Sequence, residues 1–251
     1  MFEGFERKQT NSRTATINLV QGGSGYPVLL LHGYPETHVC WHRVAPLLAE
    51  QFTVVCSDLR GCGDSSKSAG DSEHLNYSKR TMAQDQAEVM QALGFNEFAV
   101  VGHDRGARVA HRLALDHKEK VTKLALLDII PTSAAFERVD GEMATAAFNW
   151  FFSIQPDDLP ERLISADPVF TCDGFSIIGP VKRARSRRKP LPNINDASTQ
   201  TRYARRARSF AQRPQSILLT TRPTKVVEYL AQRWCCGENP ERTAAALIEF
   251  L

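Results

Sequence analysis

The sequence predicts an α/β fold, a mostly parallel sheet with helices on both faces, and three observations carry that prediction. Short, continuous apolar runs recur at residues 27–31, 52–56 and 98–101, and such runs are typical of strands buried on both faces. Segments with helical apolar spacing separate these runs. Strands that alternate with helices in this way imply right-handed crossovers between parallel neighbours.

The remaining elements follow the same two periodicities. Further strands are predicted at residues 14–21, 121–127 and 216–219. Helices are predicted at residues 39–50, 77–93, 106–117 and 240–251. With 251 residues, the chain is long enough for one α/β domain that carries an insertion.

A helical, aromatic stretch at residues 132–178 predicts that insertion, a lid over the carboxyl edge of the sheet. The C-terminal part of the fold is predicted to be incomplete, because apolar periodicity fades after the lid. The predicted division is an α/β core (1–131), a helical lid (132–180), a divergent basic segment of uncertain structure (181–237) and a C-terminal core helix (238–251).

Charge is distributed unevenly behind a small net value of +3. Residues 182–213 hold eleven Lys or Arg and one acid, Asp196, so the rest of the chain holds 20 basic and 27 acidic residues. Such a block could bind a polyanion by neutralising phosphates. Aromatic residues for base stacking are sparse in it, which favours a solvated segment over a nucleic-acid site.

The six cysteines form no Cys-x-x-Cys pair and no metal-ligand spacing with histidine, so neither a metal nor another cofactor is expected. No apolar run reaches 18 residues and the first residues are charged, so neither a membrane span nor a signal peptide is predicted. We therefore expect a reduced, cytoplasmic setting without a membrane partner. The sequence leaves a homodimer open.

Residues 99–107 have the form of a nucleophile elbow, a tight turn between a strand and a helix, with Asp104 at its tip. Gly102 and Gly106 supply the small neighbours that the turn needs. An aspartate there can attack a saturated carbon without help from a base and form an alkyl-enzyme ester. Water must then cleave that ester, with help from a general base. The weaker interpretation is a surface aspartate at a strand end.

Three more residues are predicted to surround Asp104. The loop at residues 32–35 follows a buried strand, and in an elbow site the backbone N–H groups of Tyr34 and Arg105 would form the oxyanion hole. Arg105 and Arg108 share a helix face and could clamp a substrate carboxylate. Solvated helix arginines are the alternative.

Two further candidates lie beyond the elbow. Asp128 ends a buried strand, where an acid could orient a catalytic histidine, although a cap or loop acid is the alternative. Trp150 could donate its indole N–H to a departing halide. In an aromatic cluster it could equally be part of the lid core.

These motifs together resemble the haloacetate (fluoroacetate) dehalogenases of the α/β-hydrolase superfamily. The resemblance covers about residues 1–168 and 239–251 and depends on the motifs at residues 32–35, 58–61, 102–108, 115–117, 127–131 and 166–168. An arginine directly after the nucleophile is its most specific feature, because haloalkane dehalogenases and epoxide hydrolases usually have tryptophan there.

The resemblance implies an α/β-hydrolase fold and cleavage of the carbon–halogen bond of a small halogenated carboxylate. It implies Asp104 as nucleophile, Asp128 as the acid of the triad, Arg105 and Arg108 as carboxylate binders, and Trp150 as a halide contact.

The chain departs from the family pattern at two places. Asn149 stands where the family usually has histidine, and no histidine follows His117, although the family's catalytic histidine lies near the C-terminus. We therefore hypothesise that residues 171–237 are translated in a shifted frame or come from a damaged gene, with impaired turnover. The alternatives are an epoxide hydrolase, which the lack of tyrosine in residues 132–178 disfavours, and an inactive protein with a polyanion-binding segment.

Overall fold

A computed structural model describes residues 1–129, 136–137, 139–141, 144, 147–171, 215–221, 225–231 and 239–251. The chain divides into two compact units. Unit 1 comprises residues 1–131 and 214–251, and unit 2 comprises residues 132–213. The four-part division predicted from the sequence stays a prediction. Most of the predicted basic segment lies outside the described residues, and so does the polyanion site that it could form.

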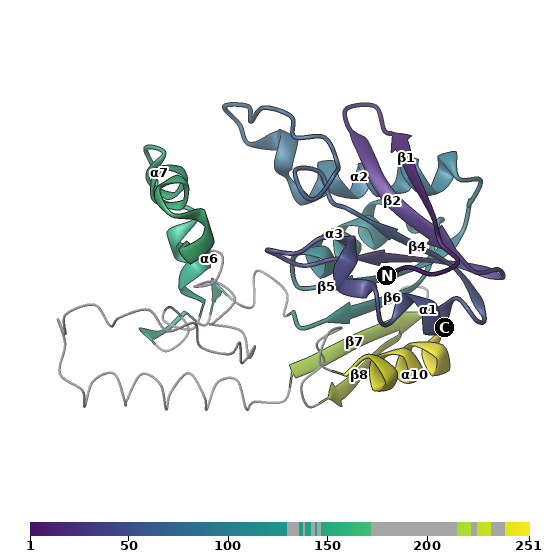
Figure 1. Cartoon of the computed structure of the whole chain (residues 1–251). Helices are drawn as coiled ribbons and strands as arrows, with labels where there is room; N and C mark the ends of the chain where they lie inside the picture. Colours follow the sequence, from purple (N-terminus) through teal and green to yellow (C-terminus); the bar gives the residue numbers. More distant parts are fainter. Residues whose placement is uncertain are drawn as a thin grey trace. The chain divides into compact units, whose positions relative to one another are not determined.

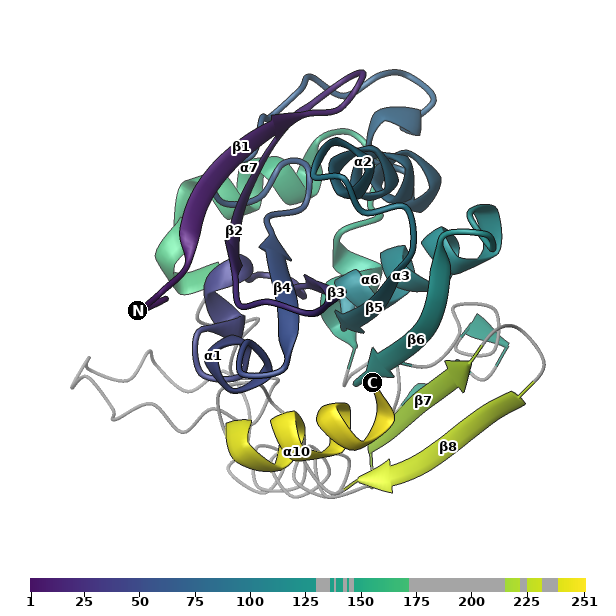
Figure 2. The same cartoon turned by 90° about the vertical axis from the view of Figure 1, so that its right-hand side faces the viewer.

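The described strands of unit 1 form one sheet in the order β1-β2-β4-β3-β5-β6-β7-β8 (Figures 1 and 2). Their bounds are β1 (Glu6–Asn11), β2 (Thr16–Gly22), β3 (Tyr26–Leu31), β4 (Phe52–Ser57), β5 (Phe98–His103), β6 (Val121–Leu127), β7 (Gln215–Thr221) and β8 (Lys225–Ala231). The four central strands are parallel, whereas β2 and β7 run antiparallel to both neighbours. All the others share one direction, which confirms the predicted mostly parallel sheet.

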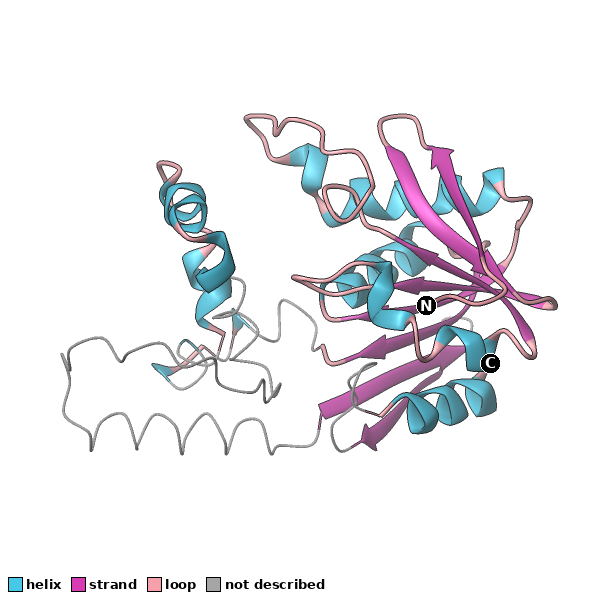
Figure 3. Cartoon of the chain, viewed as in Figure 1, coloured by secondary structure: helices cyan, strands magenta, loops and turns pink. Residues whose placement is uncertain are grey.

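Helices cover both faces of this sheet (Figures 2 and 3). Their bounds are η1 (His38–Trp41), α1 (Ala45–Leu48), η2 (Leu75–Tyr77), α2 (Lys79–Ala92), α3 (Arg105–Asp116) and α10 (Pro240–Phe250). Alternate residues of β3 separate the two faces, since Leu29 and Leu31 pack with α2 and α3, whereas Val28 and Leu30 pack with α1 and α10. Burial on both sides explains the continuous apolar runs in the sequence.

Several elements differ from the sequence prediction, and one of them is β8, for which no strand was predicted. The single helix predicted at residues 39–50 is wrong, because η1 and α1 form separately. Pro46 lies in the first turn of α1, where its ring prevents the preceding backbone from continuing a helix. Strand β1 was not predicted, since all six of its side chains are polar and none is buried.

Unit 2 contains α6 (Phe148–Phe152) and α7 (Leu159–Ala166), in the stretch predicted as a helical lid. The rings of Phe136 and Trp150 stack with centroids 6.3 Å apart, and Phe148 packs against Phe152. Among the described helices of the chain, none combines the length and the apolar character needed to cross a membrane.

Candidate active site

Asp104 occupies the sharp turn between β5 and α3, with φ 46° and ψ −112°. A positive φ is strained for a residue with a side chain, and such strain is typical of functional turns. The turn is closed by two glycines with no room for a Cβ: one on Gly102 would lie 2.5 Å from the Ala107 Cα, and one on Gly106 would lie 2.4 Å from the Leu31 oxygen. This is the geometry of a nucleophile elbow.

The carboxylate of Asp104 is held by the loop that follows β3. The backbone N–H of Tyr34 donates to Asp104 Oδ2 at 3.0 Å, and the Asp104 N–H donates to the Leu127 oxygen at the end of β6, also at 3.0 Å. The structure therefore brings Tyr34 and Asp104 together through Oδ2. The second predicted oxyanion-hole donor, the N–H of Arg105, stays a prediction.

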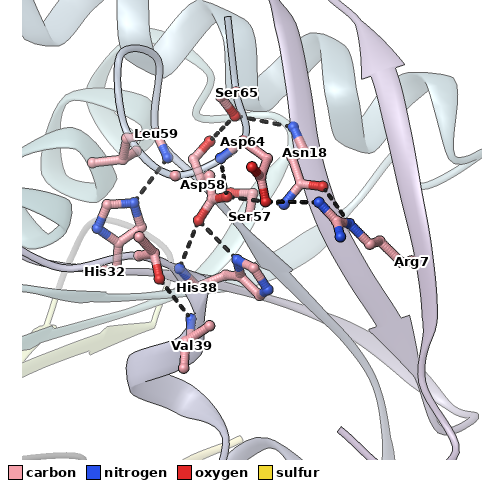
Figure 4. Close-up of polar contacts among 12 residues, drawn as sticks. Arg7, Asn18, His32, His38, Val39, Ser57, Asp58, Leu59, Asp64 and Ser65 are labelled. Atoms are coloured by element: carbon pink, nitrogen blue, oxygen red, sulfur yellow. Dashed lines mark hydrogen bonds and ion pairs between the residues drawn. The ribbon is translucent and has the colours of Figure 1, made fainter. Parts of the chain in front are cut away.

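A buried carboxylate fixes the other end of the same loop (Figure 4). Asp58 accepts hydrogen bonds from the His38 N–H at 2.7 Å, His38 Nδ1 at 2.8 Å and Asn18 Nδ2 at 2.9 Å. Burial alone would raise the pKa of Asp58, but the hydrogen bonds from His38 and from the Asp64 N–H hold it far below its usual range. His32 also connects this loop to the segment after β4, because its Nε2 accepts a hydrogen bond from the Leu59 N–H at 3.0 Å.

Three cationic side chains surround the nucleophile. The guanidinium of Arg105 lies over the Tyr34 ring, 5.9 Å from its centroid, and its buried Nε has no hydrogen-bond acceptor among the described residues. The pKa of Arg108 lies below its usual value, because burial and the charge of Arg105 lower it more than the charge of Asp104 raises it. Lys79 is the first residue of α2. Burial and the charges of Arg105 and Arg108 lower its pKa to about 8, although the charge of Asp104 acts in the other direction.

The two arginines were predicted from the sequence, whereas Lys79 was missed. A lysine at the start of an amphipathic helix usually faces solvent, and only the packing of α2 against α3 brings this one beside the site. An anion fits this surrounding chemically, since a carboxylate could accept from the orphaned Nε of Arg105. Among the described residues, no group of three His, Cys, Asp or Glu side chains could hold a metal ion.

Asp128 faces a histidine, but not one from the C-terminal part of the chain. His103, the residue before the nucleophile, places Nε2 3.4 Å from Asp128 Oδ2 and Nδ1 3.0 Å from Glu36 Oε2. Asp128 itself has φ 54°, so this strand end is also strained. His103 lies within the elbow motif and Glu36 directly follows the motif at residues 32–35, yet nothing in the sequence indicated that the two side chains contact each other.

Trp150 lies in α6 of unit 2, where it stacks on Phe136. That packing agrees with the simpler interpretation of Trp150 as part of an aromatic cluster. Its role as a halide contact stays a prediction, as does the catalytic role of Asp128.

Curated proteins of known activity resemble large parts of this chain. A curated fluoroacetate dehalogenase from Burkholderia sp is 56% identical over 168 residues, 67% of this chain and 55% of that protein. A soluble epoxide hydrolase from Corynebacterium sp. (strain C12) is 46% identical over 115 residues, 46% of this chain and 38% of that protein. The chain therefore spans little more than half the length of the first of these relatives, and less of the second.

Solved structures of alpha/beta hydrolases also resemble this chain. The crystal structure of an alpha/beta hydrolase from Nostoc sp PCC 7120 superposes with a TM-score of 0.70 and 60% identity, over 71% of this chain and 61% of that one. The model of the alpha/beta hydrolase fold family matches residues 26–165, more than half of this chain. That stretch contains β3, the elbow and the strand end at Asp128. The chain belongs to the alpha/beta hydrolase fold family.

Proposed function

We propose that this chain is a hydrolase of haloacetates, in which Asp104 displaces halide from the carbon next to the substrate carboxylate. The observation that carries the proposal is the arrangement at the elbow. One carboxylate oxygen of Asp104 is bound by the Tyr34 N–H, and the adjacent Arg105 buries an Nε without an acceptor among the described residues. The 56% identity to a fluoroacetate dehalogenase supports the same substrate class.

Charge explains why the substrate should carry a carboxylate. An anionic nucleophile and an anionic substrate 4 Å apart would repel each other by about 4 kcal/mol near a protein surface. Arg105, Arg108 and Lys79 supply positive charge around Asp104 that can offset this repulsion. A neutral haloalkane or epoxide would leave Asp104 as the one anion facing the three cations, so such a substrate would gain nothing from their charge.

The chemical step follows from the orientation of Asp104. Oδ1 forms a bond to the halogen-bearing carbon, and the carbon–halogen bond breaks with its electron pair leaving on the halide. The product is an ester of Asp104, with Oδ2 as its carbonyl oxygen. When water adds to that ester, the negative charge develops on Oδ2, where the Tyr34 N–H can stabilise it.

Cleavage of the ester is the step for which the chain is poorly equipped. General base assistance is typically worth about 10²–10⁴ in rate, and no histidine follows His117 to provide it in the usual place. His103 has one carboxylate at each ring nitrogen, so it is poorly placed to accept a proton from water. We therefore propose that alkylation of Asp104 is fast and that hydrolysis of the ester limits turnover.

Chloroacetate tests the proposal, because it reacts slowly with thiols such as Cys40 and Cys62. The chain should release halide and gain one carboxymethyl group, and peptide mapping should place it on Asp104. Asp104→Asn, nearly identical in shape, is the matched control and should do neither. The proposal fails if the unsubstituted chain forms no adduct and releases no halide, or if Asp104→Asn reacts equally well.

Epoxide hydrolysis is the second candidate, favoured by the identity to the soluble epoxide hydrolase. Such enzymes need lid tyrosines to polarise the epoxide, and residues 132–178 contain none. Incubation with a neutral epoxide such as styrene oxide distinguishes the two. Formation of a diol without any reaction with chloroacetate would favour this candidate over the first.

A further inference from the structure

An imidazole flanked by two carboxylates lies directly beside the nucleophile. His103 Nδ1 faces Glu36 Oε2 at 3.0 Å, and His103 Nε2 faces Asp128 Oδ2 at 3.4 Å. The His103 Nδ1 contact is a hydrogen bond to Glu36, and the Nε2 contact with Asp128 is an ion pair in the protonated form of the ring. The side chains of His103 and Asp128 are only 12% and 15% exposed, which strengthens their attraction relative to a surface pair.

Glu36 links this imidazole to the loop that binds Asp104. Its Oε2 also accepts the backbone N–H of Gly33 at 2.9 Å, and its own N–H donates to the Gly33 oxygen at 3.2 Å. Burial would raise the pKa of Glu36, but the hydrogen bond and charge of His103 lower it below its usual value, so the carboxylate is ionised at neutral pH. The next residue after Gly33 is Tyr34, which donates to Asp104.

Gly33 lies where all these groups converge. A Cβ on Gly33 would lie 2.9 Å from the Asp104 Cβ, 2.9 Å from Glu36 Oε2 and 3.0 Å from His103 Nδ1. The nucleophile, the carboxylate and the imidazole therefore pack around one backbone segment without spare room. A shift of Glu36 would release the Gly33 N–H and allow the neighbouring Tyr34 N–H to turn away from Asp104.

We propose that Glu36 and His103 are positioning residues for the oxyanion hole. Asp128 holds the His103 imidazolium, His103 holds the Glu36 carboxylate, and Glu36 fixes the backbone of Gly33 so that the Tyr34 N–H points at Asp104 Oδ2. Preorganised donors of this kind stabilise a developing charge because they need no reorientation during the reaction. The positioning itself is a property of the fold, whereas its effect on rate rests on the proposed haloacetate reaction.

The Tyr34 amide reports on this positioning without any turnover. The chain contains five tyrosines, so labelling with ¹⁵N-tyrosine gives few amide signals, and Tyr34→Phe identifies the one from Tyr34. Glu36→Ala should move that signal and speed its hydrogen exchange about tenfold, the loss expected for a hydrogen bond to a charged group. Glu36→Gln keeps an oxygen acceptor for the Gly33 N–H and should recover most of the protection.

Glu88 offers a matched control on α2. It likewise accepts one backbone N–H, from Arg13 at 2.7 Å, and one side-chain N–H, from Gln84 at 2.8 Å. Glu88→Ala should leave the Tyr34 amide unchanged. If Glu36→Ala does not fold, His103→Gln provides the same test, since it removes the positive charge that holds Glu36. An unchanged Tyr34 amide in a folded variant of Glu36 or His103 overturns the proposal.

The effect on chemistry separates positioning from general loosening. Glu36→Ala should slow the alkylation of Asp104 by chloroacetate about tenfold, because the Asp104 carboxylate would no longer be held in the orientation for attack. The Kd of acetate, an unreactive carboxylate, should stay the same. Equal losses in the rate of alkylation and in the affinity for acetate would indicate that the whole site is disturbed and would overturn the positioning role. If the unsubstituted chain does not react with chloroacetate, the proposed function fails, yet the Tyr34 amide still decides whether Glu36 and His103 position it.

Discussion

Replacing Gly33 with alanine should misplace Asp104 while leaving the chain folded. The added Cβ would lie 2.9 Å from the Asp104 Cβ and from Glu36 Oε2, and 3.0 Å from His103 Nδ1. The Glu36 and His103 atoms belong to side chains that can rotate, whereas the Asp104 Cβ can move only with the backbone of the elbow, and recovery of an ordinary contact at 3.4 Å needs a shift of about 0.5 Å. Because a misplacement of about 1 Å can cost about 100-fold in rate, we expect alkylation of Asp104 to slow about tenfold.

Two other glycines show why this substitution should spare the fold. A Cβ on Gly106 would lie 2.4 Å from the Leu31 oxygen and 2.5 Å from the His32 oxygen, so Gly106→Ala must push α3 away from β3. We expect a destabilisation of about 3 kcal/mol or more there, against about 1–2 kcal/mol for Gly33→Ala. Gly70→Ala has nothing within 4 Å of its new Cβ and should change the free energy of unfolding by less than about 0.5 kcal/mol.

The assay combines thermal unfolding with the rate of alkylation by chloroacetate, followed by intact mass and peptide mapping at Asp104. Gly33→Ala should lower the rate more than the stability, whereas Gly106→Ala should lower the stability first. The reasoning is refuted if Gly33→Ala alkylates Asp104 as fast as the unsubstituted chain, or if Gly70→Ala is as slow as Gly33→Ala.

Two further predictions concern buried charge. Burial, Arg105 and Arg108 lower the pKa of Lys79 to about 8, so Lys79 loses its positive charge as pH rises through that value, and acetate should bind more weakly at pH 9 than at pH 7. Lys79→Met should weaken the binding of acetate by about 1 kcal/mol at pH 7. In a calorimetric titration it should also reduce the difference in acetate affinity between pH 7 and pH 9, and an unreduced difference would contradict the prediction. Asp85→Asn should destabilise the chain by about 3–5 kcal/mol in urea unfolding, because it leaves the Arg60 guanidinium buried without its counter-charge; a loss below about 1 kcal/mol would show that the pair contributes little.

The parts of the fold that the sequence predicted are those where one force dominates. The strands around the elbow are buried on both faces, so their apolar runs leave little ambiguity, and β6 has the predicted bounds. Strand β1 escaped prediction because it is a polar edge strand held mainly by its backbone pairing with β2. The broken helix at residues 39–50 shows that apolar spacing alone does not account for the effect of Pro46.

In the candidate site, too, some residues could be placed from the sequence and others could not. Asp104 and Tyr34 could be placed from motifs, because the elbow and the loop after β3 have a fixed spatial relation in this sheet. Lys79, Glu36 and His103 could not, since their contacts depend on side chains that meet across different elements. The catalytic role of Asp128 stays a prediction, and its observed neighbour is His103, the histidine beside the nucleophile.

The amount of halide released per chain tests the central claim most directly. After mixing with excess chloroacetate, we predict a rapid release of about one halide per chain, with a stable carboxymethyl ester on Asp104, followed by slow further release. This outcome matches a competent nucleophile in a chain without a histidine after His117 to hydrolyse its ester. Release of halide without an adduct on Asp104, or no release at all, would contradict the account.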